Sequence, residues 1–99
     1  MDTLTLLKGI RGILNKPERW IKNQLSDLHD HSYCIIGAIA QLKNHSPVRI
    51  ENISSEVKAV ANAMNIKNWD ALVKYNNTPS LKYRGFRARI DRAIKRLEA

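Results

Sequence analysis

The side chains best suited to chemistry are the basic ones near the end of the chain. Residues 80–99 hold seven Lys or Arg residues against two acidic residues, a surplus of five positive charges. When this stretch is drawn as a helix, four of the seven share one flank with no acidic side chain among them. Guanidinium groups bind phosphate oxygens through paired hydrogen bonds, so this flank predicts binding of a polyanion, either nucleic acid or nucleotide. The basic stripe comprises Lys82, Arg89, Arg92 and Arg96, with Arg84 and Arg87 assisting.

The same stripe has an interpretation that needs no ligand. Basic side chains are common on solvated helix faces, and Lys or Arg near a helix C-terminus is stabilised by the helix dipole. The other flank combines Arg84, Arg87 and Lys95 with Asp91 and Glu98, so its charges are partly compensated. The sequence leaves polyanion binding and simple solvation open as alternatives.

The stretch 57–75 offers a second indication of nucleic-acid binding. A small residue, an apolar residue, a turn residue and another apolar residue follow one another at the spacing of a helix-turn-helix motif. The recognition helix would present Asn68, Asp70 and Lys74, which are a poor set for reading base edges. A helix pair that simply packs in the core is therefore the stronger alternative. The matching residues are Ala61, Met64, Asn65 and Ile66.

Metal and catalytic chemistry have little support in the sequence. His29, Asp30, His31, Cys34 and His45 include zinc-type ligands, but their spacing does not match a metal site. Cys34 lies in an apolar run that predicts burial, where a thiol is unreactive. The sequence shows no catalytic triad, phosphate loop or dinucleotide fingerprint. We therefore predict a protein that is not an enzyme and has no metal or cofactor.

The elements that must position these residues are helices. Apolar residues recur at helical spacing along most of the chain, which predicts an all-α fold, a compact bundle of about five to six short helices. Its longest member is an amphipathic, basic C-terminal helix, and a loop is expected over residues 44–52. The expected helices cover residues 3–14, a segment that begins at Pro17 and buries Trp20, Ile21 and Leu25, and residues 33–42, 54–64, 68–75 and 80–98.

Two of these helices carry more specific expectations. The run 33–42 is apolar nearly all round, which predicts a central buried helix. Its small residues would form a narrow face where another helix can approach closely: Cys34, Gly37, Ala38 and Gln41. Asn65 is a predicted helix stop, because Asn tolerates the left-handed backbone conformation. Four aromatic residues fall on apolar stripes, which favours core packing over base stacking: Trp20, Trp69, Tyr75 and Phe86.

Length and composition indicate one folded domain, residues 1–99. The chain is 43% hydrophobic and 26% charged, which is typical of globular proteins. One cysteine allows no intramolecular disulfide, and we find neither a secretion signal nor a membrane span, so a cytoplasmic location without membrane contact is expected. The net charge of +8 favours polyanionic partners, and self-association into a homo-oligomer is compatible with the length.

Four short motifs follow one another along the chain. They are Pro17 with Trp20, the Cys-x-x-Gly-Ala pattern within 33–39, the Tyr-Asn-Asn-Thr-Pro run at 75–79, and the Arg-Ala-Ile run at 92–94. In this order they resemble a family of small uncharacterised proteins common in phages and actinobacteria, and the similarity covers most of the chain. Asn77 replaces the acid that is usual in that family. The resemblance implies a phage or mobile-element accessory protein, with any shared site at Cys34, Gly37, Asn76 and Asn77.

Two alternative functions stay open at this point. The first is a protein-interaction factor, such as a phage-encoded inhibitor that docks on an acidic surface of a host defence protein. The second is a small-molecule enzyme, which a deep pocket lined by Cys34, Asn76 and Asn77 would favour.

Overall fold

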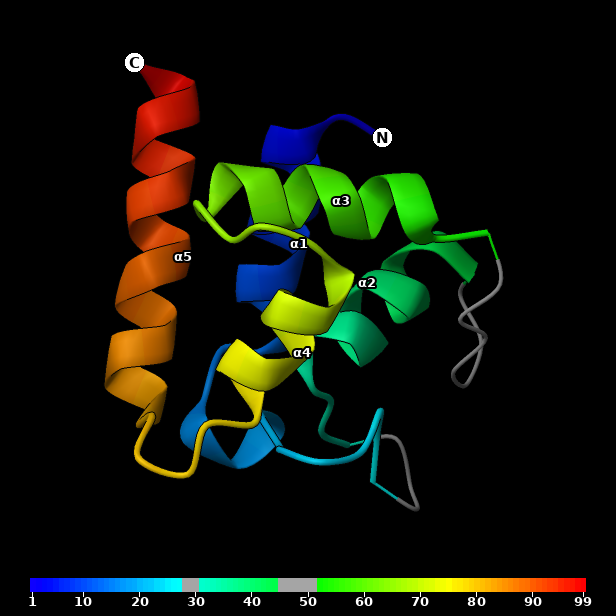
Figure 1. Cartoon of the computed structure of the whole chain (residues 1–99), viewed down its shortest axis with the longest axis vertical. Helices are drawn as coiled ribbons and strands as arrows, with labels where there is room; N and C mark the ends of the chain where they lie inside the picture. The colour runs from blue at the N-terminus through cyan, green and yellow to red at the C-terminus, as the bar shows by residue number, and fades with distance from the viewer. Residues whose placement is uncertain (28–30, 45–51) are drawn as a thin grey trace.

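The computed structural model describes residues 1–27, 31–44 and 52–99, and within them the protein is all-α, as predicted (Figure 1). Its elements are α1 (Thr3–Ile13), a 3-10 turn η1 (Pro17–Arg19), α2 (Ile35–Asn44), α3 (Ser54–Ala63), α4 (Trp69–Asn76) and α5 (Tyr83–Glu98). The helices expected over 3–14, 33–42, 54–64, 68–75 and 80–98 all occur, with ends displaced by at most three residues. Most of the loop expected over residues 44–52 lies outside the described residues.

Helix α1 stands at the centre of the bundle and packs against α2, α3 and α5. It begins where Asp2 caps it, since the Asp2 carboxylate accepts a hydrogen bond of 2.8 Å from the Thr5 N–H. Its apolar stripe buries Leu6, Leu7 and Ile10 completely or nearly so. All the helices thereby share one hydrophobic core.

Helix α2 is the buried central element that the apolar run predicted. Six consecutive residues from Ile35 to Ala40 are buried, which requires neighbours on every side. At Gly37, however, the neighbour on the small-residue face is not a helix. The carbonyl group of Leu25, in the irregular segment after η1, lies directly against Gly37.

The prediction of a helix that begins at Pro17 is wrong beyond the first turn. After η1 the chain continues without regular secondary structure, with bends at residues 22–25, and Trp20 and Ser26 each form an isolated bridge to Tyr33. Main-chain groups of Arg19, Ile21 and Leu25 bond to residues 33 and 34 rather than within a helix: Ile21 N–H to Tyr33 C=O at 3.1 Å, Tyr33 N–H to Arg19 C=O at 2.9 Å and Cys34 N–H to Leu25 C=O at 3.2 Å. Asn23 adopts a positive φ of 65°, which a helix does not allow.

Helix α5 forms one side of the molecule, with its C-terminal half beside the end of α3 (Figure 1). Its buried stripe consists of Phe86, Ile90, Ala93 and Ile94, and it packs mainly on α1. Leu97 follows Ile90 by seven residues, the spacing of the same stripe, but is 45% exposed. In the described parts of the chain, no helix combines the length and apolar character that crossing a bilayer requires.

Candidate anion-binding site

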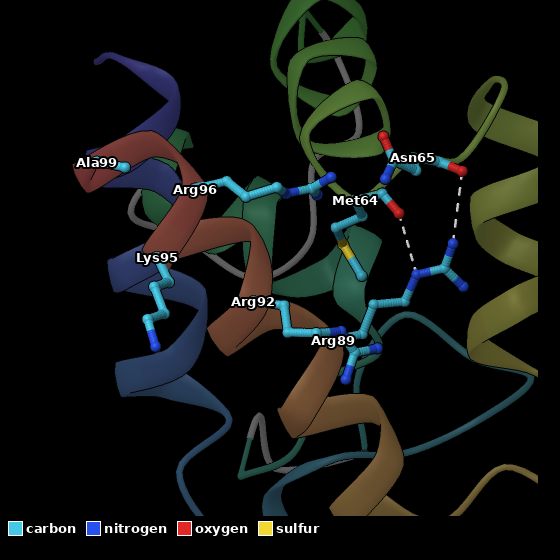
Figure 2. Close-up of a pocket in the computed structure, with 7 residues that line it drawn as sticks. All are labelled: Met64, Asn65, Arg89, Arg92, Lys95, Arg96 and Ala99. Atoms are coloured by element: carbon cyan, nitrogen blue, oxygen red, sulfur yellow. Dashed lines mark hydrogen bonds between the residues drawn. The ribbon is translucent and has the colours of Figure 1, made fainter.

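A cationic pocket lies where the C-terminal end of α3 meets α5 (Figure 2). Its volume is about 520 Å³, and it opens to solvent. Four basic side chains of α5 border it, and among the described residues that line it there is no Asp or Glu side chain. The lining residues are Met64, Asn65, Arg89, Arg92, Lys95, Arg96 and Ala99.

Arg89 is the most firmly held of the four cations. Its Nε donates to the Met64 carbonyl oxygen at 3.0 Å, and a terminal nitrogen donates to that of Asn65 at 3.4 Å (Figure 2). The guanidinium carbon also lies 4.6 Å from the ring centroid of Tyr75, a cation–π distance. These contacts restrain the side chain in one position while leaving its positive charge uncompensated.

Arg96 donates to the carbonyl oxygen of Ala63, the last residue of α3. The last carbonyls of a helix have no partner within the helix and carry its negative partial charge. Arg89 and Arg96 together satisfy three such carbonyls, those of residues 63, 64 and 65. Two of the arginines predicted to bind a ligand thus also cap α3.

Arg92 and Lys95 are the unengaged cations of the pocket. Both are exposed, and neither makes a hydrogen bond or ion pair with any residue that the structure describes. Arg92 lies between Arg89 and Arg96 along α5, whereas the Lys95 side chain points away from the three arginines (Figure 2). Their donors are therefore available to a ligand without breaking an internal contact.

The pocket divides the predicted basic stripe. Arg89, Arg92 and Arg96 come together, as expected, but Lys82 and Arg84 lie at the first turn of α5 and do not line it. Arg87 is directed elsewhere: its hydrogen bond with Tyr83 and the nearby Asp91 carboxylate raise its pKa further above the usual range. Lys95, which the helical wheel assigned to the opposite flank, is also among the lining residues.

The acidic residues of α5 are turned away from the pocket. Asp91 pairs with Arg11 and Arg87, both at 3.5 Å, and Glu98 pairs with Lys8 at 2.9 Å. These pairs lie on the side of α5 that faces α1. They leave the positive charge on the α3 side uncompensated, which favours an anionic ligand there.

We predict that Arg89→Gln lowers the free energy of unfolding by about 1–2 kcal/mol, since it removes a cation–π contact and two hydrogen bonds to helix-end carbonyls. Arg92→Gln is the matched control, because it removes the same charge but no contact, and it should change stability by less than about 0.5 kcal/mol. Urea unfolding followed by circular dichroism measures both. Equal effects of the two substitutions would contradict the capping role.

A second pocket gathers residues that the family resemblance singled out. It has a volume of about 260 Å³ and is bordered by α4, the start of α2 and residues 23–25. Cys34, Asn76 and Asn77 all line it, whereas Gly37 does not but lies against Leu25, another lining residue. A pocket lined by these three residues is the arrangement that would favour a small-molecule enzyme, so their hydrogen bonds decide what they do.

Asn76 uses all its hydrogen-bonding capacity inside the protein. Its side-chain oxygen accepts from the Trp20 indole N–H at 2.7 Å and from the Ile35 N–H at 3.1 Å. Its Nδ2 donates to the Ile21 carbonyl oxygen at 3.1 Å and to the Asn77 Oδ1 at 3.0 Å. The residue is 1% exposed, so this amide is a buried link between α4, the segment after η1 and the start of α2.

Cys34 and Gly37 take part in the same set of buried contacts, through the carbonyl group of Leu25. The Leu25 carbonyl oxygen accepts from the Cys34 N–H and occupies the space where a side chain on Gly37 would begin. Burial raises the pKa of the Cys34 thiol, and hydrogen bonding to the Gly37 N–H offsets this only in part. A buried thiol with a raised pKa holds little reactive thiolate, so the contacts of this cluster are structural.

The other candidate sites have separate outcomes. Of the five residues considered as metal ligands, His29, Asp30 and His45 lie outside the described residues, and the described ones include no group of three His, Cys, Asp or Glu that could hold a metal. The helix pair α3–α4 turns at Asn65, whose φ of 59° confirms the predicted helix stop. On α4, Asn68, Asp70 and Lys74 are exposed, so an acidic side chain stands at the start of the helix that would read DNA.

Comparison of the chain with protein-family models, with curated proteins and with solved structures finds no match. The resemblance to the phage and actinobacterial family therefore stays a prediction.

Proposed function

We propose that this protein is a non-enzymatic binding module that holds a phosphate-bearing polyanion in the pocket between α3 and α5. The observation that carries the proposal is the set of four basic side chains around one pocket with no described acidic side chain among its lining residues. Bringing these charges together raises the electrostatic potential locally, and a phosphate-rich ligand relieves it.

The basic side chains of the pocket differ in how firmly internal contacts hold them, and this difference supports the proposal. Arg89 is restrained by Tyr75 and by carbonyl groups, so its side chain loses little further conformational entropy when a ligand binds. Arg92 and Lys95 retain all their donors for the ligand, and arginine matches the geometry of two phosphate oxygens. The site thus combines a cation that is already held in place with two cations that make no internal contact.

The test compares two double variants that remove the same charge. Arg92→Gln/Lys95→Gln changes the pocket, whereas Lys82→Gln/Arg84→Gln changes exposed cations of the same helix outside it. With about four phosphate contacts, the logarithm of affinity for duplex DNA should fall with the logarithm of salt concentration at a slope near −3.6. The pocket variant should bind at least about tenfold more weakly, with a slope near −1.8, and the control should keep most of the affinity.

Fluorescence anisotropy across a salt series measures these values. If the wild type shows no salt-sensitive binding, or if both variants lose the same affinity for DNA, the pocket is not the binding site. A protein partner with an acidic surface would then be the function to pursue, by co-purification after nuclease treatment.

A further inference from the structure

The aromatic residues bear on which kind of polyanion fits this site. Proteins that hold single-stranded nucleic acid stack its bases on exposed aromatic rings beside a basic groove. Here the Trp20 ring stacks on that of Phe86 with centroids 4.4 Å apart, inside the core. Tyr75 contacts both Phe86 and the Arg89 guanidinium. No aromatic side chain lines the cationic pocket among the described residues, so the bases of a single strand have no ring to stack on there.

The remaining aromatic residues lie away from the pocket. Tyr33 is 4% exposed, and the Tyr83 hydroxyl donates to the Leu14 carbonyl oxygen at the opposite side of α5. Trp69 is half-buried and lines the second pocket. All six aromatic residues of the chain are thereby accounted for, and the contacts available to a ligand in the cationic pocket are to its phosphates.

The composition of α5 bears on sequence specificity. Base edges in the major groove are read by paired hydrogen bonds from Arg, Asn or Gln, with Ser and Thr as lesser partners. Helix α5 contains no Asn, Gln, Ser or Thr, and two of the three arginines in the pocket are held by carbonyls of α3. Only Arg92 retains a free guanidinium there among the described residues, which is too little to specify a sequence.

The two held arginines converge on neighbouring carbonyl groups. Arg89 donates to those of residues 64 and 65, and Arg96 donates to that of residue 63. Their guanidinium groups are therefore restrained beside one another before a ligand binds. Restrained cations suit a partner whose phosphates are themselves held in place, as in a duplex, better than a flexible single strand that must be ordered on binding.

From these observations we infer that the ligand of the pocket is double-stranded nucleic acid, bound through its phosphates and without preference for base sequence. This inference rests on the function proposed above. It names phosphates of a rigid duplex as the recognised chemistry, which DNA and RNA duplexes share. Neither base stacking nor base-edge contact contributes to binding.

The experiment is an anisotropy titration of the full chain with four labelled probes of about 16 nucleotides per strand. Two are DNA duplexes of unrelated sequence, one is a DNA single strand, and one is an RNA duplex. We expect the two DNA duplexes to bind within about threefold of each other and the single strand at least about tenfold more weakly. The tighter of the DNA and RNA duplexes identifies the source of the phosphates.

The double variant Arg92→Gln/Lys95→Gln adds an internal check. Loss of phosphate contacts should weaken binding to both DNA sequences by the same factor, whereas loss of a base contact would weaken one sequence selectively. A single strand that binds as tightly as the duplexes, or a preference above about tenfold for one DNA sequence, would overturn the inference and leave the proposed function standing. If no probe binds in a salt-sensitive manner, the proposed function itself fails.

Discussion

Replacement of Gly37 by alanine is expected to destabilise the protein by about 3 kcal/mol or more, or to prevent folding. A Cβ atom at this position would lie 1.9 Å from the Leu25 carbonyl oxygen and 2.9 Å from its carbonyl carbon. Both are backbone atoms, so no side-chain rotation relieves the overlap. The chain around Leu25 must move off α2, which breaks the hydrogen bond from the Cys34 N–H to the same oxygen.

Gly12→Ala is the matched control for this prediction. Nothing lies within 4 Å of the Cβ position at Gly12, which is exposed within α1. Alanine there should raise the free energy of unfolding by about 0.5–1 kcal/mol, because it favours the helix and restricts the unfolded chain. Urea unfolding of both variants decides the matter: a Gly37→Ala protein within about 1 kcal/mol of the wild type would show that the contact with Leu25 is not tight.

The second large effect is expected for Asn76→Asp, which should lower the free energy of unfolding by about 3–4 kcal/mol at pH 7. The substitution removes both N–H donors, so the Ile21 carbonyl and the Asn77 side-chain oxygen would face a buried carboxylate. The oxygen that accepts from Trp20 and Ile35 is retained. Asn62→Asp is the control, because Asn62 is exposed on α3 and should change stability by less than about 0.5 kcal/mol.

The Asn76→Asp penalty should also depend on pH. Burial and two facing oxygens raise the pKa of the introduced carboxyl in the folded state above its unfolded value of about 3.9. The folded form then keeps its proton where the unfolded form has lost it, so the stability of the variant falls as pH rises through the raised pKa. The difference from wild type should be smaller at pH 4.5 than at pH 7. A penalty that is equal at both values would show that the carboxyl reaches solvent.

Local periodicity was sufficient to predict most of the fold. The apolar spacing of α5 places Phe86, Ile90 and Ile94 in the core wherever the helix docks, because side-chain direction along a helix follows from residue number. The same reasoning found α1 and the buried α2. It also placed Arg89, Arg92 and Arg96 together on one side of the last helix.

The segment after Pro17 shows where local reasoning stops. Trp20, Ile21 and Leu25 have spacing that suits a helix. The backbone groups of Arg19, Ile21 and Leu25 bond instead to residues 33 and 34, which lie beyond the reach of a local pattern. Asn76 completes this arrangement from a position more than 50 residues away in the chain. The residues near Pro17 carry no local signal that separates a helix from a segment whose backbone bonds to distant residues.

By itself, the sequence determined that this protein is helical and that its last helix carries uncompensated positive charge, since both follow from the order of residue types along one element. Only the tertiary structure decided what those side chains do. The approach of α3 divides the arginines into two that cap its carbonyls and one that stays free, and it brings Lys95 to the same pocket. The folding of residues 19–27 and 31–34 onto α2 and α4 makes Gly37 and Asn76 structural, because burial there satisfies the amide and leaves the glycine no space for a side chain.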